Sequence, residues 1–426
     1  MTLIQAKDVF TPNHYPEHTL VLREKDHTSD IQDAIDDLSL VSLSGPSKSG
    51  KTVLVESAIG HSRLLSVTGG GIETADDVWK KIIDLIGTPD SRTITNTNSE
   101  ASSNTYGVAV KVGPRIANVS GSGSNTEQEV AATQSAQTFT RDPFNLVADY
   151  LAGSDSVIFI DDFHYIPLET QKIIAQQIKE LVRKKVSIVY ASVPYHSDDI
   201  IRANSDLQGR LSKIDLSYWE EQELAEIARR GFQILNFVCD DSAINRLVHE
   251  AAGSPQLMQS LCLHLCRVMD SRTSEPSDNP PKDITPSDAQ FRQVCLKVST
   301  TTDYENLIEK LLEGAPTRGN GRKSYNLKDG SRGDVYTLTL KALKQDPALM
   351  TIRYNVLYER VRSICEEIPQ STSIMQACAK ISEISGTHVT KDGEDPKLLI
   401  EFDSEDSVIA IRDPYLLYAL RWSNNI

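Results

Sequence analysis

Short apolar runs alternate with amphipathic stretches over the first half of the chain, up to about residue 217. The apolar runs predict strands at 39–44, 63–68, 157–161, 186–192 and 212–216. Apolar residues at helical spacing predict helices at 51–61, 74–87, 142–152, 168–183 and 197–204. Strands that alternate with helices in this way indicate a parallel α/β sheet.

One segment, residues 89–140, interrupts the alternation. It is rich in Ser, Thr, Asn and Gly, and two short alternating runs flank Gly113-Pro114. This pattern favours a β-hairpin on a flexible base. The same composition is equally typical of a disordered loop.

Beyond residue 217 the pattern becomes helical and then mixed. Helices are predicted at 219–231, 241–251, 254–269, 288–298 and 302–313, with a Pro-rich linker at 270–288. Further helices followed by two strands, "KLLIEF" and "SVIAIRD", indicate a winged helix at the end of the chain. The predicted domains are an α/β core over 1–217 with the insertion 89–140, a helical lid over 218–315, a basic flexible linker over 316–333 and a winged-helix-like domain over 334–426.

The stretch "LSGPSKSGKTVL" directly follows the first predicted strand of the sheet. Its spacing, Gly45-x-x-x-x-Gly50-Lys51-Thr52, is the P-loop pattern, in which backbone N–H groups surround a phosphate chain. Lys51 supplies a charge for the β- and γ-phosphates, and the Thr52 hydroxyl is a Mg²⁺ ligand. The loop therefore predicts an ATP site formed by Gly45, Pro46, Ser47, Lys48, Ser49, Gly50, Lys51, Thr52 and Val53.

A second acidic element completes such a site. "SVIFIDDFHYI" carries four apolar residues that lead into Asp161 and Asp162, which resembles a Walker B strand. Asp161 is predicted to hold Mg²⁺ together with Thr52, and Asp162 to position the attacking water. The next strand ends at Ser192, which is a candidate sensor of the γ-phosphate or, alternatively, a strand-end cap.

Taken together, residues 10 to 270 resemble the AAA+ and STAND ATPases, P-loop proteins with a catalytic acid on the Walker B strand. "TLVLREKDHTSDIQDAI" is similar to their N-terminal box, which implies that Val21 and Arg23 lie near the adenine. "GSP", which ends at Pro255, is similar to the GxP element of the STAND lid. Arg210 stands where an AAA+ arginine finger would act on a neighbouring subunit; Arg202 is the alternative, as is a purely structural role for Arg210.

The resemblance implies the activity as well. It predicts an ATPase that converts ATP and water to ADP and phosphate, in a homo-oligomer with sites at subunit interfaces. Asp162 replaces the glutamate of many AAA+ motors, and no pore loop is recognisable, so we expect a slow switch that engages an effector protein, by analogy in antiviral defence signalling. The alternatives are a DNA-binding AAA+ initiator or transposition regulator, and a module that binds nucleotide without hydrolysis.

Charge and composition limit the partners. The net charge is −15, and residues 334–426 hold ten Lys/Arg against fourteen Asp/Glu, so broad attachment to nucleic acid is not favoured. The basic residues of 316–333 are either a local phosphate contact or a solvated loop; they are Arg318, Arg322, Lys323, Lys328 and Arg332. The sequence shows no apolar run long enough for a bilayer and no signal peptide, which predicts a cytoplasmic protein without membrane attachment.

Overall fold

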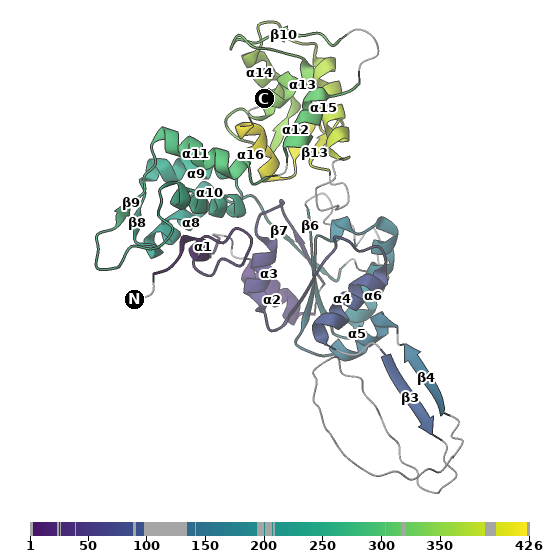
Figure 1. The fold of residues 1–426 in the computed structure, drawn as a ribbon. Helices are drawn as coiled ribbons and strands as arrows, with labels where there is room; N and C mark the ends of the chain where they lie inside the picture. The colour runs from purple at the N-terminus through teal and green to yellow at the C-terminus, as the bar shows by residue number, and fades with distance from the viewer. Residues whose placement is uncertain are drawn as a thin grey trace, which may run out of the picture.

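In the computed structural model, the chain folds into a sheet-containing core, a helical lid and a C-terminal domain (Figure 1). The structure describes residues 3–423 except for 24, 26, 39, 88–90, 98–133, 141, 194–199, 201–206, 208, 303, 317–320 and 388–397. In these described ranges, none of the helices combines the length and apolarity that crossing a bilayer requires.

Five parallel strands form the central sheet. They are β1 (Leu40–Ser44), β2 (Leu64–Thr68), β5 (Val157–Asp161), β6 (Ser187–Ser192) and β7 (Leu211–Asp215), in the order β2-β5-β6-β1-β7. Each lies within one residue of its predicted range at either end. The predicted P-loop α/β fold is confirmed, with β6 inserted between the P-loop strand β1 and the acidic strand β5.

Alternate side chains of the strands are buried under two layers of helices. α4 (Ala75–Ile86), α5 (Pro143–Leu151) and α6 (Leu168–Arg183) cover one face, where Ile158 and Ile160 lie. α2 (Thr28–Asp36) and α3 (Lys51–Ile59) cover the other face, where Val157 and Phe159 lie. Burial on both faces explains why these strands read as continuous apolar runs. The helix predicted at 197–204 falls almost wholly outside the described residues.

The insertion between α4 and α5 contributes a separate two-stranded sheet. β3 (Ser91–Thr97) pairs antiparallel with β4 (Gln134–Thr140), and Figure 1 shows the pair projecting away from the central sheet. The hairpin predicted around Gly113-Pro114 lies outside the described residues.

The lid is built from α8 (Glu221–Ile234), α9 (Asp241–Ala251), α10 (Pro255–Val268) and α11 (Asp288–Ser299), with β8 (Phe237–Val238) paired to β9 (Lys282–Asp283). The N-terminal lead-in also packs into the lid, through α1 (Ala6–Val9) and Phe10. The ring of Phe10 lies so close to Gly231 that a Cβ there would stand 2.2 Å from its Cζ. This packing differs from the predicted domain division, which assigns the lead-in to the α/β core.

The C-terminal domain combines α13 (Val335–Leu343), β12 (Thr351–Arg353), α14 (Tyr354–Ile364), α15 (Ser371–Ser385), β13 (Ile400–Asp403), β14 (Val408–Ile411) and α16 (Pro414–Trp422). The strands form an antiparallel sheet in the order β12-β14-β13. Helices followed by two strands agree with the predicted order, whereas β12, which lies between α13 and α14 and pairs with β14, is absent from the prediction. α12 (Glu305–Glu313) joins this core through Leu307, Ile308 and Leu311, although the prediction assigned it to the lid.

The predicted flexible linker differs from what the structure shows over 321–333. β10 (Tyr325–Asn326) pairs with β11 (Arg332–Gly333), and Tyr325 and Leu327 are buried in the C-terminal core. Two buried apolar side chains among Gly and charged residues are enough to fix the segment, and composition alone hides them.

Two cations of this segment form ion pairs. Arg322 pairs with Asp334 at 2.7 Å and stacks over the Tyr336 ring at 4.7 Å. Lys323 pairs with Glu367. Arg322 is thereby tied to its own domain, whereas the pair of Lys323 with Glu367 is exposed and weak.

A buried ion pair joins the lid to the C-terminal domain. Arg421 of α16 donates two hydrogen bonds to the Glu250 carboxylate of α9, at 2.9 and 3.2 Å, and both side chains are 9% exposed. The Trp422 indole donates to the same carboxylate at 2.8 Å. Tyr418 of α16 lies inside the lid core. These contacts indicate that the lid and the C-terminal domain move together.

Removing one partner of this pair should destabilise the protein strongly, because the other charge stays buried without compensation. We expect Arg421→Ala to lower the free energy of unfolding by about 3 kcal/mol, measured by urea denaturation. The matched control is Arg362→Ala, which breaks an exposed pair with Glu359 three residues away and should leave the unfolding midpoint nearly unchanged. Equal effects of the two substitutions would contradict the proposed importance of the buried pair.

Candidate nucleotide site

The P-loop turns tightly between β1 and α3. Gly50 has φ 89°, a left-handed conformation that glycine adopts without strain, and α3 begins at the next residue. Gly45 needs its lack of a side chain for a different reason, since a Cβ there would lie 2.9 Å from Leu216 Cβ. The two glycines of the motif thus meet two separate constraints, one on conformation and one on space.

Lys51 is buried at the centre of this loop. Its Nζ donates to the carbonyls of Gly45 and Pro46, both at 2.9 Å. Burial lowers the pKa of the Lys51 amine, while the nearby Asp161 and Asp162 carboxylates oppose that shift. The ammonium is therefore held over its own loop, close to where the predicted phosphates would lie.

The predicted metal ligands are in direct contact. The Thr52 hydroxyl, in the first turn of α3, donates to Asp161 Oδ2 at 2.5 Å across to the end of β5. A hydroxyl and a carboxylate side by side form an oxygen donor set that suits Mg²⁺. Asp162 lines the same cavity and begins a turn with φ 52°.

Ser192 lies at the base of the P-loop. Its side chain is fully buried, and within the described part of the chain its Oγ has no hydrogen-bond partner. Its carbonyl accepts a hydrogen bond from the Gly45 N–H at 3.3 Å. A buried unpaired hydroxyl is costly. Ser192 is not among the residues that line the cavity described below, so its role as a sensor stays a prediction.

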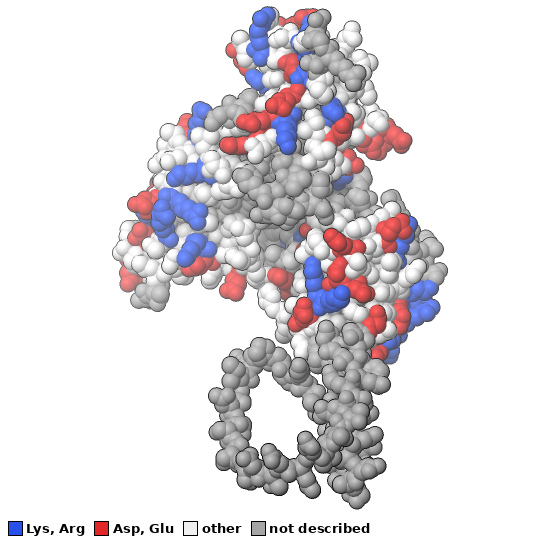
Figure 2. All heavy atoms as spheres, turned by 45° about the vertical axis from the view of Figure 1, so that its right-hand side comes forward, with Lys and Arg blue, Asp and Glu red and all other residues white. Residues whose placement is uncertain are grey.

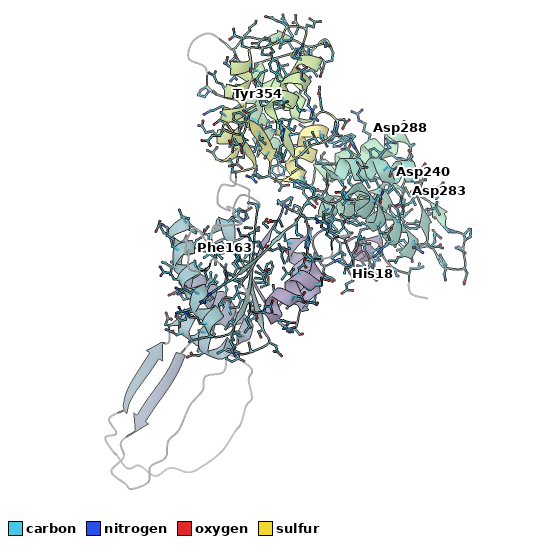
Figure 3. All side chains as sticks on the ribbon, turned by 180° about the vertical axis from the view of Figure 1, so that it is seen from behind. His18, Phe163, Asp240, Asp283, Asp288 and Tyr354 are labelled. Atoms are coloured by element: carbon cyan, nitrogen blue, oxygen red, sulfur yellow. The ribbon has the colours of Figure 1, made fainter. Side chains whose placement is uncertain are left out.

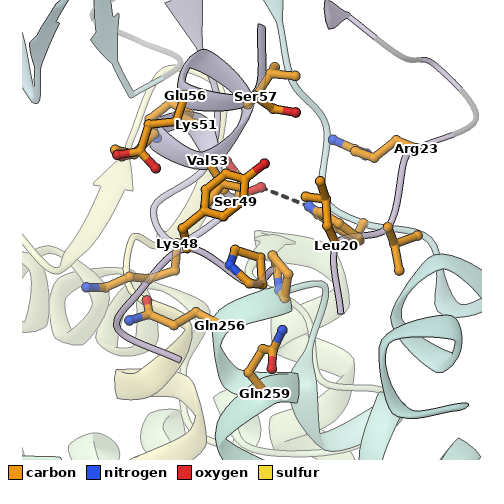
Figure 4. Close-up of a pocket in the computed structure, with 18 of the residues that line it drawn as sticks. Leu20, Arg23, Lys48, Ser49, Lys51, Val53, Glu56, Ser57, Gln256 and Gln259 are labelled. Atoms are coloured by element: carbon orange, nitrogen blue, oxygen red, sulfur yellow. Dashed lines mark hydrogen bonds between the residues drawn. The ribbon is translucent and has the colours of Figure 1, made fainter. Parts of the chain in front are cut away.

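The cavity above the P-loop has a volume of about 590 Å³. Figure 4 shows Lys48 of the P-loop close to Gln256 of the lid, with Gln259 below and Lys51 farther away beside Glu56. Most of the predicted nucleotide-binding residues line it, namely Val21, Arg23, Ser47, Lys48, Ser49, Gly50, Lys51, Thr52, Val53, Asp161, Asp162 and Pro255. Gly45 and Pro46 instead lie beneath it and accept the hydrogen bonds of Lys51.

Several cavity residues are absent from the sequence prediction. Trp219 donates from its indole N–H to the Ser49 carbonyl at 2.8 Å. Ser254, which belongs to the predicted "GSP" element and lies beside the cavity, donates from its hydroxyl to the Lys48 carbonyl at 3.4 Å. His14 and Tyr15 enter from the lead-in. The aromatic and proline-rich stretch "TPNHYPEH" was the available signal for the lead-in; Trp219 is placed only by the tertiary fold.

Arg23 has a structural role in this conformation. It stacks over the Trp219 ring at 5.4 Å and donates to the Ser217 and Tyr218 carbonyls at 3.1 and 3.0 Å. It also pairs with Glu223 at 3.4 Å. Arg23 thereby fixes the lead-in to the segment that connects the sheet with the lid.

Arg210 lies far from the cavity of its own chain. It is exposed and immediately precedes β7, and its carbonyl accepts a hydrogen bond from Leu40 N–H at the start of β1. The P-loop begins at the opposite end of β1. The five residues of that strand separate it from the Arg210 end by about 16 Å. Arg202 lies outside the described residues.

Comparisons with known proteins bear on the fold. No family model matches the chain. A Holliday junction branch migration complex subunit RuvB 2 from a Synechococcus species is 27% identical over 139 residues, which is 29% of this chain and 37% of that protein. The match therefore spans little more than a third of the relative.

Solved structures resemble the whole chain. The Walker-type ATPase PABY2304 of Pyrococcus abyssi aligns with a TM-score of 0.50 and 12% identity, over 94% of this chain and 96% of that one. The Aeropyrum pernix ORC2 protein aligns with a TM-score of 0.47 and 10% identity, over 99% and 97% of the two chains. At 12% identity the likeness to the Pyrococcus abyssi protein concerns the fold alone.

Proposed function

We propose that this chain binds Mg²⁺ and ATP in the cavity above the P-loop, hydrolyses ATP slowly, and uses the bound nucleotide to position its lid and C-terminal domain. The observation that carries the proposal is the contact of Thr52 with Asp161 beside the buried Lys51. A cation ligand pair and a phosphate-binding amine converge there at the carboxyl end of a parallel sheet, where such ligands bind.

Each residue of the site has a separate role in ATP binding or hydrolysis. Lys51 would exchange its two loop carbonyls for the β- and γ-phosphate oxygens. Thr52 and Asp161 would hold Mg²⁺, which neutralises phosphate charge. Asp162 would accept a hydrogen bond from the attacking water and align it with the γ-phosphorus, while Ser192 would donate to the γ-phosphate.

Coupling to the lid follows from the contacts of the P-loop. Trp219 and Ser254 touch the carbonyls of Ser49 and Lys48, whose N–H groups belong to the phosphate-binding loop. A nucleotide that reorients these peptides changes the partners of the lid directly. The lid in turn carries the C-terminal domain through the Glu250 and Arg421 pair.

Binding and hydrolysis should separate between two variants. Lys51→Ala should abolish ATP binding measured by calorimetry, because it removes the P-loop amine. Asp162→Asn should bind Mg²⁺ and ATP as the wild type does but hydrolyse ATP about a hundredfold more slowly, since Asp161 is retained. Lys80→Ala, which removes an exposed lysine of α4 that does not line the cavity, is the matched control and should retain binding. If Asp162→Asn hydrolysed ATP at the wild-type rate, another acidic residue would have to position the attacking water.

An oligomer with shared sites is the arrangement in which Arg210 could act, because it lies too far from its own P-loop. We expect Arg210→Ala to slow hydrolysis about a thousandfold while its own cavity still binds ATP. Mixing it with Lys51→Ala should restore some activity, because some interfaces then join an intact cavity to an intact arginine. Full activity of Arg210→Ala alone would give this residue a structural role.

DNA is the second candidate partner, favoured over defence signalling by the partial match to a protein named as a branch migration subunit. The charges restrict where DNA could bind. Figure 2 shows Lys and Arg intermixed with Asp and Glu on the visible face, with basic side chains gathered over the lid. The turn between β13 and β14 carries Glu405 and Asp406, which repel phosphate.

An ATP-dependent DNA-binding protein should bind a four-way junction or a duplex only in its ATP state. Asp162→Asn with ATP should therefore bind labelled DNA by fluorescence anisotropy at about 50 mM salt, and lose affinity steeply by about 200 mM. Lys51→Ala is the control that should not bind. Absence of binding by Asp162→Asn at the lower salt concentration would reject this candidate and favour a protein partner.

A further inference from the structure

The turn that carries Asp162 is held on its inner side. Asp162 adopts φ 52° and ψ 41°, its N–H donates to Asp161 Oδ1 at 2.9 Å, and its carbonyl accepts from Tyr165 N–H at 3.0 Å. The next residue, Phe163, is fully buried, with its ring 5.4 Å from that of Tyr190 on β6. Figure 3 shows Phe163 within the core, close to the sheet.

The loop after β2 contacts the other side of the same turn through Gly69. Gly69 donates from its N–H to the Asp161 carbonyl at 2.8 Å. A Cβ on Gly69 would stand 2.5 Å from the carbonyl oxygen of Asp162 and 3.1 Å from both its carbonyl carbon and Ile166 Cγ1. The closest of these atoms belongs to the backbone, so it cannot move aside as the end of a side chain could.

The requirement at this position is for space. The φ of Gly69 is not in the left-handed region, so alanine there would meet no conformational penalty of its own. An added methyl group would have to push the Asp162 carbonyl oxygen away by roughly 0.9 Å, from 2.5 Å to the 3.4 Å at which ordinary contact begins. A misplacement of about 1 Å in a catalytic group can cost about a hundredfold in rate.

We propose that Gly69 is a positioning residue for Asp162: its missing side chain lets the β2 loop support the turn that aims the catalytic carboxylate. This inference rests on the proposed function, because it requires Asp162 to act in hydrolysis. It also predicts a sharp contrast with the next residue. A Cβ on Gly70 would lie 3.7 Å from Thr68 Oγ1, which is ordinary contact.

The experiment compares Gly69→Ala with Gly70→Ala in the full chain. We expect Gly69→Ala to lower kcat about tenfold to a hundredfold while the Kd for ATP, measured by calorimetry, stays within about twofold of the wild type. Gly70→Ala should match the wild type in both. Combining Gly69→Ala with Asp162→Asn should reduce the rate no further than Asp162→Asn alone, because the two act through one carboxylate.

Hydrogen exchange adds a readout of position. In Gly69→Ala, amides of 162–166 should exchange faster while those of the central sheet keep their protection. A kcat equal to the wild type, a loss that adds fully to that of Asp162→Asn, or protection lost across the whole sheet would each overturn the inference. Absence of hydrolysis by the wild type would overturn the proposed function together with it, so the two failures are distinguishable.

Discussion

The burial of one amine organises the nucleotide site. An ammonium inside a protein needs negative charge or carbonyl oxygens around it, and Lys51 has both, from its own loop and from the acidic pair at the end of β5. The P-loop must therefore curl back over its lysine, and β5 must lie close enough to β1 for Asp161 to reach Thr52. A triphosphate with Mg²⁺ satisfies the same charges, so the loop is already arranged for the ligand that its sequence pattern predicts.

A few hydrogen bonds connect the P-loop around Lys51 to the lid and the C-terminal domain. The carbonyls of Lys48 and Ser49 are peptide groups of the phosphate-binding loop, and each accepts a hydrogen bond from a residue of the lid segment. Beyond that segment, the buried carboxylate of Glu250 binds both Arg421 and Trp422. Its desolvation makes separation of the lid from the C-terminal domain costly. The proposed switch therefore moves the two parts as one body against the sheet.

Sequence patterns predicted the elements of the fold well, because buried parallel strands and amphipathic helices have strong periodicities. β5 and α6 begin and end at the predicted residues. The P-loop and the acidic pair were predictable because their chemistry demands fixed residue types. The patterns failed where a contact joins distant segments. Phe10 enters the lid core, and Tyr325 anchors a segment whose composition is typical of a linker. Trp219 likewise contacts the P-loop from a distant segment, and no local sequence pattern predicts this contact.

The glycines around the site show which side of it can move. Gly45 approaches Leu216 and Gly69 approaches Asp162 so closely that no side chain fits, which fixes the start of the P-loop and the turn at Asp162 against their neighbours. Close-packed contacts of this kind have no intermediate positions, because any displacement costs either overlap or a void. On the lid side, Trp219 and Ser254 each donate one hydrogen bond to the loop, at 2.8 and 3.4 Å. One hydrogen bond can be lost at a net cost of only about 1 kcal/mol, so these two contacts can be replaced by others. Nucleotide-dependent motion should therefore open or close the lid and leave the carboxyl edge of the sheet in place.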